Sequence, residues 1–391
     1  MKFAKRIQGI NSSFVRDILK LTKEKDIISF AGGLPLAECF PTEEFDKAAH
    51  EILKSKASAQ KALQYGESAG LFKLREIIAE SYKQKDNLDI DPELVLITNG
   101  SQQGLDLVSK VFIESGDKLL LEAPSYLAAI QAFQFYEPEF VSVGLEQDGP
   151  NIAELEQVKD VKLFYFVPNF QNPSGVTWQD AARQKVADWA RQNDVLLLED
   201  DPYGEIRFEG QRQKPLLHFY ENTIMLGSFS KILAPGLRLG WIVAPNKEIF
   251  DKLLLAKQSS DLHTSEFTQS IAAKFYENFD AQAHIEKISK KYKEQKDVLV
   301  KELEKLDLKL NNPEGGMFVW ARFKESVNTV EFLKYAVKEG VAFVPGAPFF
   351  VGAEIPQNYA RFNYTNADAE LIKTGVRRLK LALEKYNGRS Q

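Results

Sequence analysis

Residues 223–244 have the sequence TIMLGSFSKILAPGLRLGWIVA, in which a polar segment separates two apolar runs. The runs TIMLGS (223–228) and LGWIVA (239–244) have the length and composition of strands that are buried on both faces. Gly, Ser and Pro in the intervening segment are typical of a loop. The stretch therefore predicts two strands of a buried sheet, with Lys231 in the loop that follows the first strand.

The same alternation extends outward over about residues 94 to 244, where short apolar runs alternate with longer amphipathic segments. Further strands are predicted at 94–98, 118–122, 140–143, 162–167 and 195–199. Helices are predicted at 102–114, 125–135 and 179–192. This order is typical of a wound, mostly parallel α/β sheet, whose ligands bind beyond the carboxyl ends of the strands.

The carboxyl-terminal third has a different pattern. Residues 246–306 are predicted to be helical and highly charged, most clearly in KISKKYKEQKDVLVKELEKL (287–306). Beyond them, strands are predicted at 317–323 and 359–364 and a final helix at 366–386. This last part therefore indicates a smaller α+β unit.

Composition excludes several function classes. The 391 residues include 50 Lys plus Arg and 55 Asp plus Glu, a net charge of −5 that argues against a nucleic-acid-binding surface. The single cysteine, Cys39, and only four histidines argue against a zinc site or an internal disulfide. The amino terminus lacks the apolar stretch of a signal peptide, and the most apolar segment, 341–353, is too short to cross a bilayer. We therefore expect a cytoplasmic protein without a resident metal, whose partners are small molecules or other proteins.

The segment around Lys231 carries the most specific signal. A lone lysine is usually a solvated surface charge, but this one lies in the pattern S-x-S-K-x-x-x-P-G-x-R-x-G-W (228–241). That pattern resembles the Schiff-base lysine signature of the fold type I, class I/II aminotransferases, which use pyridoxal 5′-phosphate. The resemblance implies that Lys231 is the catalytic lysine that holds the cofactor. It also implies that Ser228, Ser230 and Arg238 bind the cofactor's phosphate.

Upstream, VLLLEDDPYGEIRF (195–208) places Asp200 and Tyr203 at the end of a predicted strand. A carboxylate beside a pyridine nitrogen keeps that nitrogen protonated, and a phenol can donate a hydrogen bond to the ring's 3-oxygen. In the family the carboxylate lies three residues before the tyrosine, which selects Asp200 for this role. For Asp201 we favour a loop-capping or helix-capping carboxylate.

Three further motifs match the family in the required order. In the N-P-x-G turn of 172–175, Asn172 corresponds to the asparagine that contacts the 3-oxygen and the substrate carboxylate, whereas Asn169 falls outside the motif. Ser101 and Gln102 begin a predicted helix and resemble the family's phosphate-binding pair, although a simple helix cap is the alternative. Tyr126 occupies the place of the aromatic ring that stacks on the pyridine, although an isolated tyrosine is more often a core residue.

Two matches lie outside the predicted sheet. Tyr65, before a glycine-rich turn, resembles a tyrosine that reaches the phosphate in the neighbouring subunit, which implies a homodimer with shared active sites. Arg361, in a predicted strand, resembles the arginine that binds the substrate α-carboxylate; an edge-strand charge is the alternative. The resemblance also implies a large cofactor domain over 49–289 and a small domain made of 1–48 and 290–391.

The segment INSSFVRDILKLTKEKDIISFAGGLPLAECFP (10–41) is most similar to the 2-aminoadipate/kynurenine aminotransferase group, whose amino-terminal segment closes over the substrate. Gly32 and Gly33 would allow close backbone approach to the substrate. Arg16 corresponds to a position that binds a distal carboxylate in some relatives, or else is an exposed helix charge. No counterpart is evident for the second arginine with which aspartate aminotransferases bind a dicarboxylate.

The resemblance implies a ping-pong aminotransferase in which Lys231 both tethers the cofactor and moves the substrate's Cα proton. The expected donors are 2-aminoadipate, glutamate, aromatic or other amino acids, and the expected acceptor is a 2-oxo acid such as 2-oxoglutarate. One alternative is a lyase or decarboxylase that uses the same cofactor. A less favoured one is a non-catalytic sensing module, which would need a DNA-binding domain for which the sequence leaves no room.

Overall fold

The computed structural model describes residues 2–8, 10, 18, 20 and 26–388. Its largest sheet has seven strands in the order β2-β8-β7-β6-β5-β3-β4. All neighbouring pairs are parallel except those of β8, which runs antiparallel to β2 and β7. The predicted wound, mostly parallel sheet is therefore confirmed. The strands are β2 (Val95–Thr98), β3 (Lys118–Ala123), β4 (Glu139–Gly144), β5 (Leu163–Phe166), β6 (Leu196–Asp201), β7 (Thr223–Ser228) and β8 (Gly240–Val243).

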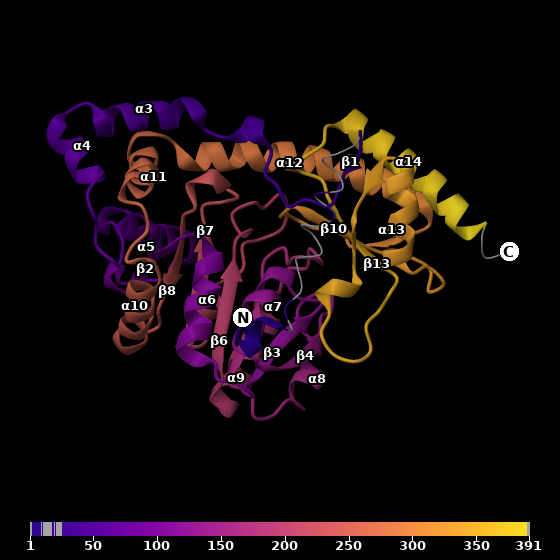
Figure 1. The fold of residues 1–391 in the computed structure, drawn as a ribbon, viewed down its shortest axis with the longest axis horizontal. Coiled ribbons are helices and arrows are strands. Elements are labelled where there is room, and N and C mark those ends of the chain that lie inside the picture. Colours follow the sequence, from indigo (N-terminus) through magenta and orange to yellow (C-terminus); the bar gives the residue numbers. More distant parts are fainter. Residues whose placement is uncertain (1, 9, 11–17, 19, 21–25, 389–391) are drawn as a thin grey trace.

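Helices cover both faces of this sheet, which explains why its strands are apolar throughout. Leu119 and Leu121 of β3 pack in one cluster with residues of α6 and α7, whereas Leu120 packs in another cluster with residues of α9. Figure 1 shows α6 and α7 in front of the strands. The helices that follow or precede these strands are α5 (Phe72–Asp86), α6 (Ser101–Phe112), α7 (Leu127–Gln134), α8 (Ile152–Leu155), α9 (Asp180–Asn193), α10 (Lys247–Asp261) and α11 (Glu266–Asn278).

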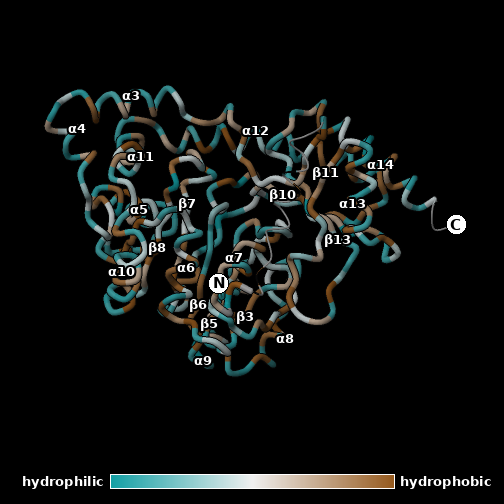
Figure 2. The backbone as a smooth tube through the Cα atoms, viewed as in Figure 1, coloured by the Kyte–Doolittle hydropathy of each residue, from teal (hydrophilic) through white to brown (hydrophobic). Residues whose placement is uncertain are grey.

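A second unit is built on a four-stranded sheet of order β12-β13-β10-β9, whose neighbouring strands are all antiparallel. It comprises β9 (Lys309–Leu310), β10 (Phe318–Arg322), β12 (Val344–Pro345) and β13 (Tyr359–Asn363), with helices α13 (Thr329–Lys338) and α14 (Ala369–Asn387). In α14 the buried residues Ile372, Val376 and Leu379 recur every three or four positions. The corresponding alternation of hydrophilic and hydrophobic residues is visible along α14 in Figure 2.

The long helix α12 (Ala281–Leu303) connects the two units and crosses the top of the view in Figure 1. Its buried hydrophobic residues belong to one core cluster that also contains residues of α5, α13 and α14. The proposed domain boundary between residues 289 and 290 lies inside this continuous helix, and the division into two domains stays a prediction.

The amino-terminal part joins the second unit by a long-range pairing. Strand β1 (Ile28–Ser29) pairs in parallel with β11 (Val341–Ala342). The remaining elements are α1 (Lys5–Gln8), α3 (Thr42–Leu53), α4 (Lys56–Ala62) and the 3₁₀ turns η1 (Ala37–Cys39), η2 (Pro92–Leu94), η3 (Leu216–His218), η4 (Pro235–Leu237), η5 (Glu304–Leu306) and η6 (Ala347–Phe349). Within the described part of the chain, no helix is both long and apolar enough to cross a membrane.

Candidate active site

A cavity of about 410 Å³ lies where the carboxyl ends of the central strands meet the second unit. Ser228 reaches it from β7, Asp200 from β6, and Asn172 from the turn after β5. Phe318 and Arg361 reach it from β10 and β13 of the other sheet. The cavity is therefore at the strand edge at which wound α/β sheets bind ligands.

Lys231 lies on the loop after β7 and lines this cavity. Its Nζ donates a hydrogen bond of 2.8 Å to the carbonyl oxygen of Gly33, which comes from the amino-terminal segment. Burial, and then the positive charges of Arg361 and Arg238, lower the pKa of Lys231 to about 8. At neutral and mildly alkaline pH the lysine therefore exchanges between an ammonium and a nucleophilic amine.

Asp200 is buried beside the cavity, and only one of its carboxyl oxygens has a protein partner. Tyr165 donates its hydroxyl to Oδ2 at 3.0 Å, whereas the buried Oδ1 has no hydrogen-bond partner in the structure. Burial raises the pKa of Asp200 to about 7, against the lowering effect of the Tyr165 hydrogen bond. The Asp200 carboxyl can therefore accept a hydrogen bond from a bound cationic group, since no described residue occupies its Oδ1.

Arg361, Asn172 and Tyr203 form a connected set of donors and acceptors. The Nη1 of Arg361 donates to Asn172 Oδ1 at 2.8 Å, and Asn172 Nδ2 donates to the Tyr203 hydroxyl at 3.3 Å. The guanidinium of Arg361 lies 4.2 Å from the ring centre of Phe318 and 5.2 Å from that of Phe349. Its buried Nε has no partner among the described residues, so a hydrogen-bond donor remains available for an anionic ligand.

The other end of the cavity is bordered by Arg238 and the start of α6. Arg238 donates from Nη2 to the carbonyl oxygen of Asn99 at 3.3 Å, and its own backbone has the left-handed φ of 55°. Gly100 has a φ of +77°, and a side chain there would meet Arg238 Nη2 at 2.8 Å. Ser101 and Gln102 follow on the first turn of α6 and also line the cavity. A cation and a helix start together make a site for an anion.

Most of the predicted site residues are brought together here. The cavity is lined by Gly33, Ser101, Gln102, Tyr126, Asn172, Asp200, Tyr203, Ser228, Ser230, Lys231, Arg238 and Arg361. Tyr65 is not among its lining residues: its ring is 77% exposed and lies edge-on to His263, with ring centres 5.6 Å apart. Arg16 lies outside the described residues.

Asp201 and Asn169, to which the motifs assign no role in the site, make structural contacts. Asp201 accepts hydrogen bonds from the backbone N–H of Gly204 at 2.7 Å and from Asn169 Nδ2 at 2.8 Å. The prediction of a loop-capping carboxylate is thus confirmed. Asn169 in turn accepts from the fully buried Arg183, so this chain of contacts joins the turn after β5 to the turn after β6.

Sequence reasoning missed several residues around the cavity. Phe318 and Phe349 flank Arg361, and Tyr165 holds Asp200. Phe349 lies in the apolar stretch 341–353, whose composition gives no sign of a contact with Arg361. Tyr165 lies in a strand that neighbours β6, so a prediction of strand order would have been needed to find it.

Comparisons with known proteins give the family. The sequence model of the family described as aminotransferase class I and II matches residues 25–379. An aromatic-amino-acid aminotransferase 1 of Thermococcus litoralis is 43% identical, over 96% of this chain and 93% of that protein. A 2-aminoadipate transaminase of Thermus thermophilus is 39% identical, over 98% of this chain and 96% of that protein. The crystal structure of Pyrococcus horikoshii kynurenine aminotransferase, in complex with PMP and kynurenine, superposes with a TM-score of 0.93. It is 39% identical and is matched over 98% of this chain and 97% of that chain.

The chain belongs to the class I and II aminotransferases. It has the fold type I architecture and is a pyridoxal-phosphate-dependent enzyme that transfers amino groups between amino acids and 2-oxo acids. The predicted family, cofactor and reaction class are therefore confirmed, as is the resemblance to the 2-aminoadipate/kynurenine group.

The residues present fit that cofactor. Its pyridinium nitrogen needs a buried acceptor, and Oδ1 of Asp200 is a buried acceptor without a partner. Its phosphate needs positive charge and backbone donors, which Arg238 and the start of α6 offer at the cavity edge. Its aldehyde needs an amine, and the amine of Lys231 has a lowered pKa.

Proposed function

We propose that this cavity binds pyridoxal phosphate, with its phosphate held by Arg238, Ser228, Ser230, Ser101 and Gln102. The observation that carries the proposal is the buried, unpartnered Oδ1 of Asp200 in a cavity that also holds Lys231. Tyr126, half-buried on the cavity wall, provides an aromatic ring for the flat face of the cofactor.

Bound there, the cofactor supplies an electron sink for the negative charge that develops at the substrate's α-carbon. Asp200 holds the proton on the ring nitrogen, because an ionised carboxylate stabilises the adjacent cation. Tyr203 and Asn172, linked by their hydrogen bond of 3.3 Å, donate to the ring's 3-oxygen. These residues keep the ring in the protonation state that accepts charge.

Lys231 has two roles in the proposal: it anchors the cofactor, and its free amine then removes the proton from the α-carbon. A pKa of about 8 suits both roles, since the amine is neutral in part of the molecules near neutral pH. The carbonyl of Gly33, which accepts from Nζ at 2.8 Å, orients the amine toward the cavity.

We infer that the Arg361 guanidinium binds the substrate's α-carboxylate and thereby aligns the Cα–H bond for removal. Phe318 and Phe349 hold the guanidinium plane by stacking. The donor is an amino acid from a broad set that includes 2-aminoadipate, glutamate and aromatic amino acids. The acceptor is a 2-oxo acid such as 2-oxoglutarate. Relatives that act on aromatic amino acids and on 2-aminoadipate support this breadth.

The proposed assembly is a homodimer in the cytoplasm, in which Tyr65 reaches the phosphate in the neighbouring subunit. Tyr65 is 77% exposed, and the nearby Leu63 and Leu262 are 70% and 54% exposed, which favours a partner surface at this end of the molecule. Residues 1–48 and 290–391 would act as the small domain that closes over the cavity.

The proposal is tested by a half-reaction with the purified holoenzyme. Glutamate, 2-aminoadipate and phenylalanine are added separately without an acceptor, and the absorbance of the bound cofactor is followed. We expect at least one of them to convert the cofactor to its amine form, and 2-oxoglutarate to reverse the conversion. Release of carbon dioxide without that conversion would instead indicate a decarboxylase, a lyase that uses the same cofactor.

Lys231→Ala is the control variant for this experiment. Loss of the amine should reduce turnover by roughly three orders of magnitude or more, because general base and nucleophile are both removed. Full turnover by Lys231→Ala would refute the central role of this residue.

A further inference from the structure

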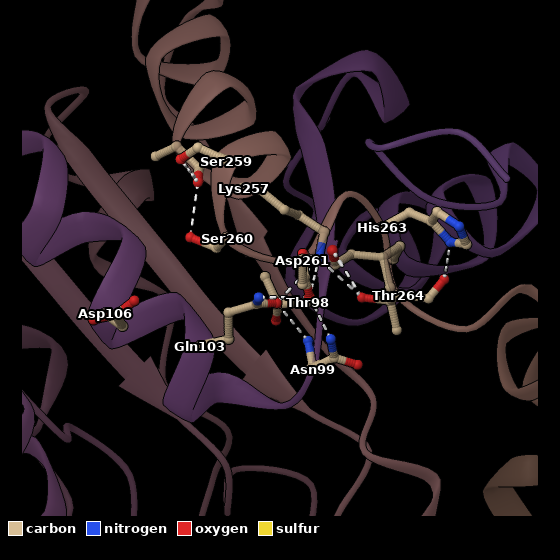
Figure 3. Close-up of polar contacts among 12 residues, drawn as sticks. Thr98, Asn99, Gln103, Asp106, Lys257, Ser259, Ser260, Asp261, His263 and Thr264 are labelled. Atoms are coloured by element: carbon tan, nitrogen blue, oxygen red, sulfur yellow. Dashed lines mark hydrogen bonds and ion pairs between the residues drawn. The ribbon is translucent and has the colours of Figure 1, made fainter. Parts of the chain in front are cut away.

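A partly buried polar cluster lies behind the turn that leads into α6. We name it the Asp261 cluster; its members are Asn99, Gln103, Lys257, Asp261 and Thr264. Figure 3 shows Lys257 and Asp261 at the end of α10, with Asn99 and Gln103 pointing toward them from the start of α6. None of these residues lines the cavity or belongs to the motifs that identified the family.

Lys257 is the buried cation of this cluster, and its side chain is fully shielded from solvent. Its Nζ donates to Asp261 Oδ1 at 2.9 Å, to Gln103 Oε1 at 3.0 Å and to Thr264 Oγ1 at 3.1 Å. The ammonium's donors are thus satisfied by groups from two helices and the segment that follows α10. Such complete pairing is what makes a buried charge tolerable.

Asp261 is the acceptor toward which the α6 turn is directed. Its Oδ2 accepts from Gln103 Nε2 at 2.7 Å and from Asn99 Nδ2. Gln103 also accepts the backbone N–H of Asn99 at 2.8 Å. Asn99 is consequently held through both its side chain and its main chain.

The restrained residue lies directly before the proposed phosphate site. Its carbonyl oxygen accepts from Arg238 at 3.3 Å, and the next two residues, Gly100 and Ser101, line the cavity. The same helix carries a second Lys–Asp pair at the same spacing, Lys247 and Asp251, whose side chains are 67% and 52% exposed. Support of the helix itself needs only such an exposed pair, so the full burial of Lys257, beside an Asp261 side chain that is 23% exposed, points to a different role.

We propose that Lys257 and Asp261 are positioning residues for phosphate binding, which hold Asn99 so that Ser101 and Arg238 present their donors to the phosphate. The inference rests on the proposed phosphate-binding role of Arg238 and the α6 turn. The Lys257–Asp261 pair should therefore affect how tightly the cofactor's phosphate is bound, and not how its ring is bound.

The test compares pyridoxal phosphate with pyridoxal, which lacks the phosphate. Apoenzyme carrying Asp261→Asn is titrated with each compound by absorbance, and its assembly state is checked by light scattering. We expect the affinity for pyridoxal phosphate to fall about tenfold or more, the scale seen when a residue that orients a ligand contact is removed. The affinity for pyridoxal should change by less than about twofold.

Asp251→Asn is the matched control, because it breaks the exposed pair of the same helix and should leave both affinities unchanged. The double variant Lys257→Met with Asp261→Leu removes both charges and avoids an unpaired buried one. It should bind pyridoxal phosphate at least as weakly as Asp261→Asn, since a leucine at 261 offers Asn99 and Gln103 no acceptor. The double variant also tests the positioning role if Asp261→Asn fails to fold.

Two results would overturn the inference: unchanged binding of pyridoxal phosphate in the double variant, or an equal loss for both compounds. Arg238→Ala separates this failure from failure of the proposed function. If Arg238→Ala weakens pyridoxal phosphate binding selectively and the Asp261 variants do not, only the positioning role is wrong. If Arg238→Ala has no selective effect, the proposed phosphate site itself is wrong.

Discussion

Asp200 is a residue at which folding and catalysis have opposite requirements. Its carboxyl is buried, one oxygen accepts from Tyr165, and the other has no partner. In the folded apoenzyme burial raises its pKa to about 7, well above the ordinary value of 3.8. A raised carboxyl pKa means that the folded state binds the proton more tightly than the unfolded state. Stability associated with this group is therefore lost as the pH rises from about 4 to about 7, and the loss is complete above that range.

Asp200→Asn should for this reason stabilise the apoenzyme at pH 8 and leave its stability nearly unchanged at pH 4. We expect a gain of ~1–3 kcal/mol in the free energy of unfolding at the higher pH, because the buried charge is removed. The same substitution should lower kcat/KM of the holoenzyme by ~100-fold or more, the scale of removing one preorganised charge from a water-excluded site. Urea unfolding of the apoenzyme at both pH values and steady-state kinetics measure the two effects. A variant that is less stable at pH 8 than the unchanged protein would contradict the explanation.

The residues that sequence could predict are those that belong to local motifs. Lys231, Arg238 and Asn172 all line the cavity, and the sequence predicts them because each lies at a fixed distance from Gly, Pro or Ser residues that shape its loop. Phe318 and Phe349 could not be found in this way, since their proximity to Arg361 depends on how the second sheet packs against the first. The same reason applies to the Asp261 cluster: Asn99 and Gln103 lie more than 150 positions from the members of the cluster at the end of α10.

At the scale of elements, the start of β8 and the start of α6 approach each other closely. A side chain at Gly240 would lie 2.7 Å from the backbone of Gly100 and Ser101 and 2.8 Å from the carbonyl oxygen of Gly227. These neighbours are all main-chain atoms, so they cannot move aside as a flexible side chain can. The close approach brings the loop that carries Lys231 and Arg238 against the first turn of α6.

Gly240→Ala should therefore separate the two elements and weaken the phosphate site. We expect a loss of ~1–3 kcal/mol in the free energy of unfolding, the usual cost of overpacking, together with weaker binding of pyridoxal phosphate. Gly236→Ala is the matched control from the same loop, because a side chain there meets no atom within 4 Å. Chemical denaturation and cofactor titration of both variants provide the measurement. Equal behaviour of the two variants would show that the close approach is unimportant.

The strands and helices were predictable to the extent that burial determines their composition. Strands β3, β5, β6 and β7 appear as apolar runs because helices cover both faces of the sheet. The antiparallel direction of β8 cannot be predicted from its composition, because an apolar run has the same composition in either direction. Strands β1, β11 and β12 have only two residues each, and their pairing depends on contacts distant in sequence.

At the scale of the whole molecule, the cavity combines residues from both ends of the chain. Gly33 contacts Lys231 through its carbonyl oxygen, and Arg361 donates to the carbonyl oxygen of Ala31 at 2.7 Å. The amino-terminal segment thus touches both the proposed catalytic lysine and the proposed carboxylate-binding arginine. A change of position in this segment would affect proton transfer and substrate binding together.

Tyr65 provides the test of the proposed shared active site, because it is exposed in one chain and would complete the site of the other. Subunits carrying Lys231→Ala and subunits carrying Tyr65→Ala are co-expressed with different tags, and the mixed dimer is purified. If Tyr65 acts across the interface, one site of the mixed dimer carries both changes and the other carries neither. Symmetric dimers then predict about half of the unchanged enzyme's activity for the mixed dimer, well above that of either variant homodimer. A mixed dimer of Lys231→Ala with unchanged subunits sets the reference value. If Tyr65 acts within its own chain, both sites of the first mixed dimer are defective, and its activity would be about half that of the Tyr65→Ala homodimer.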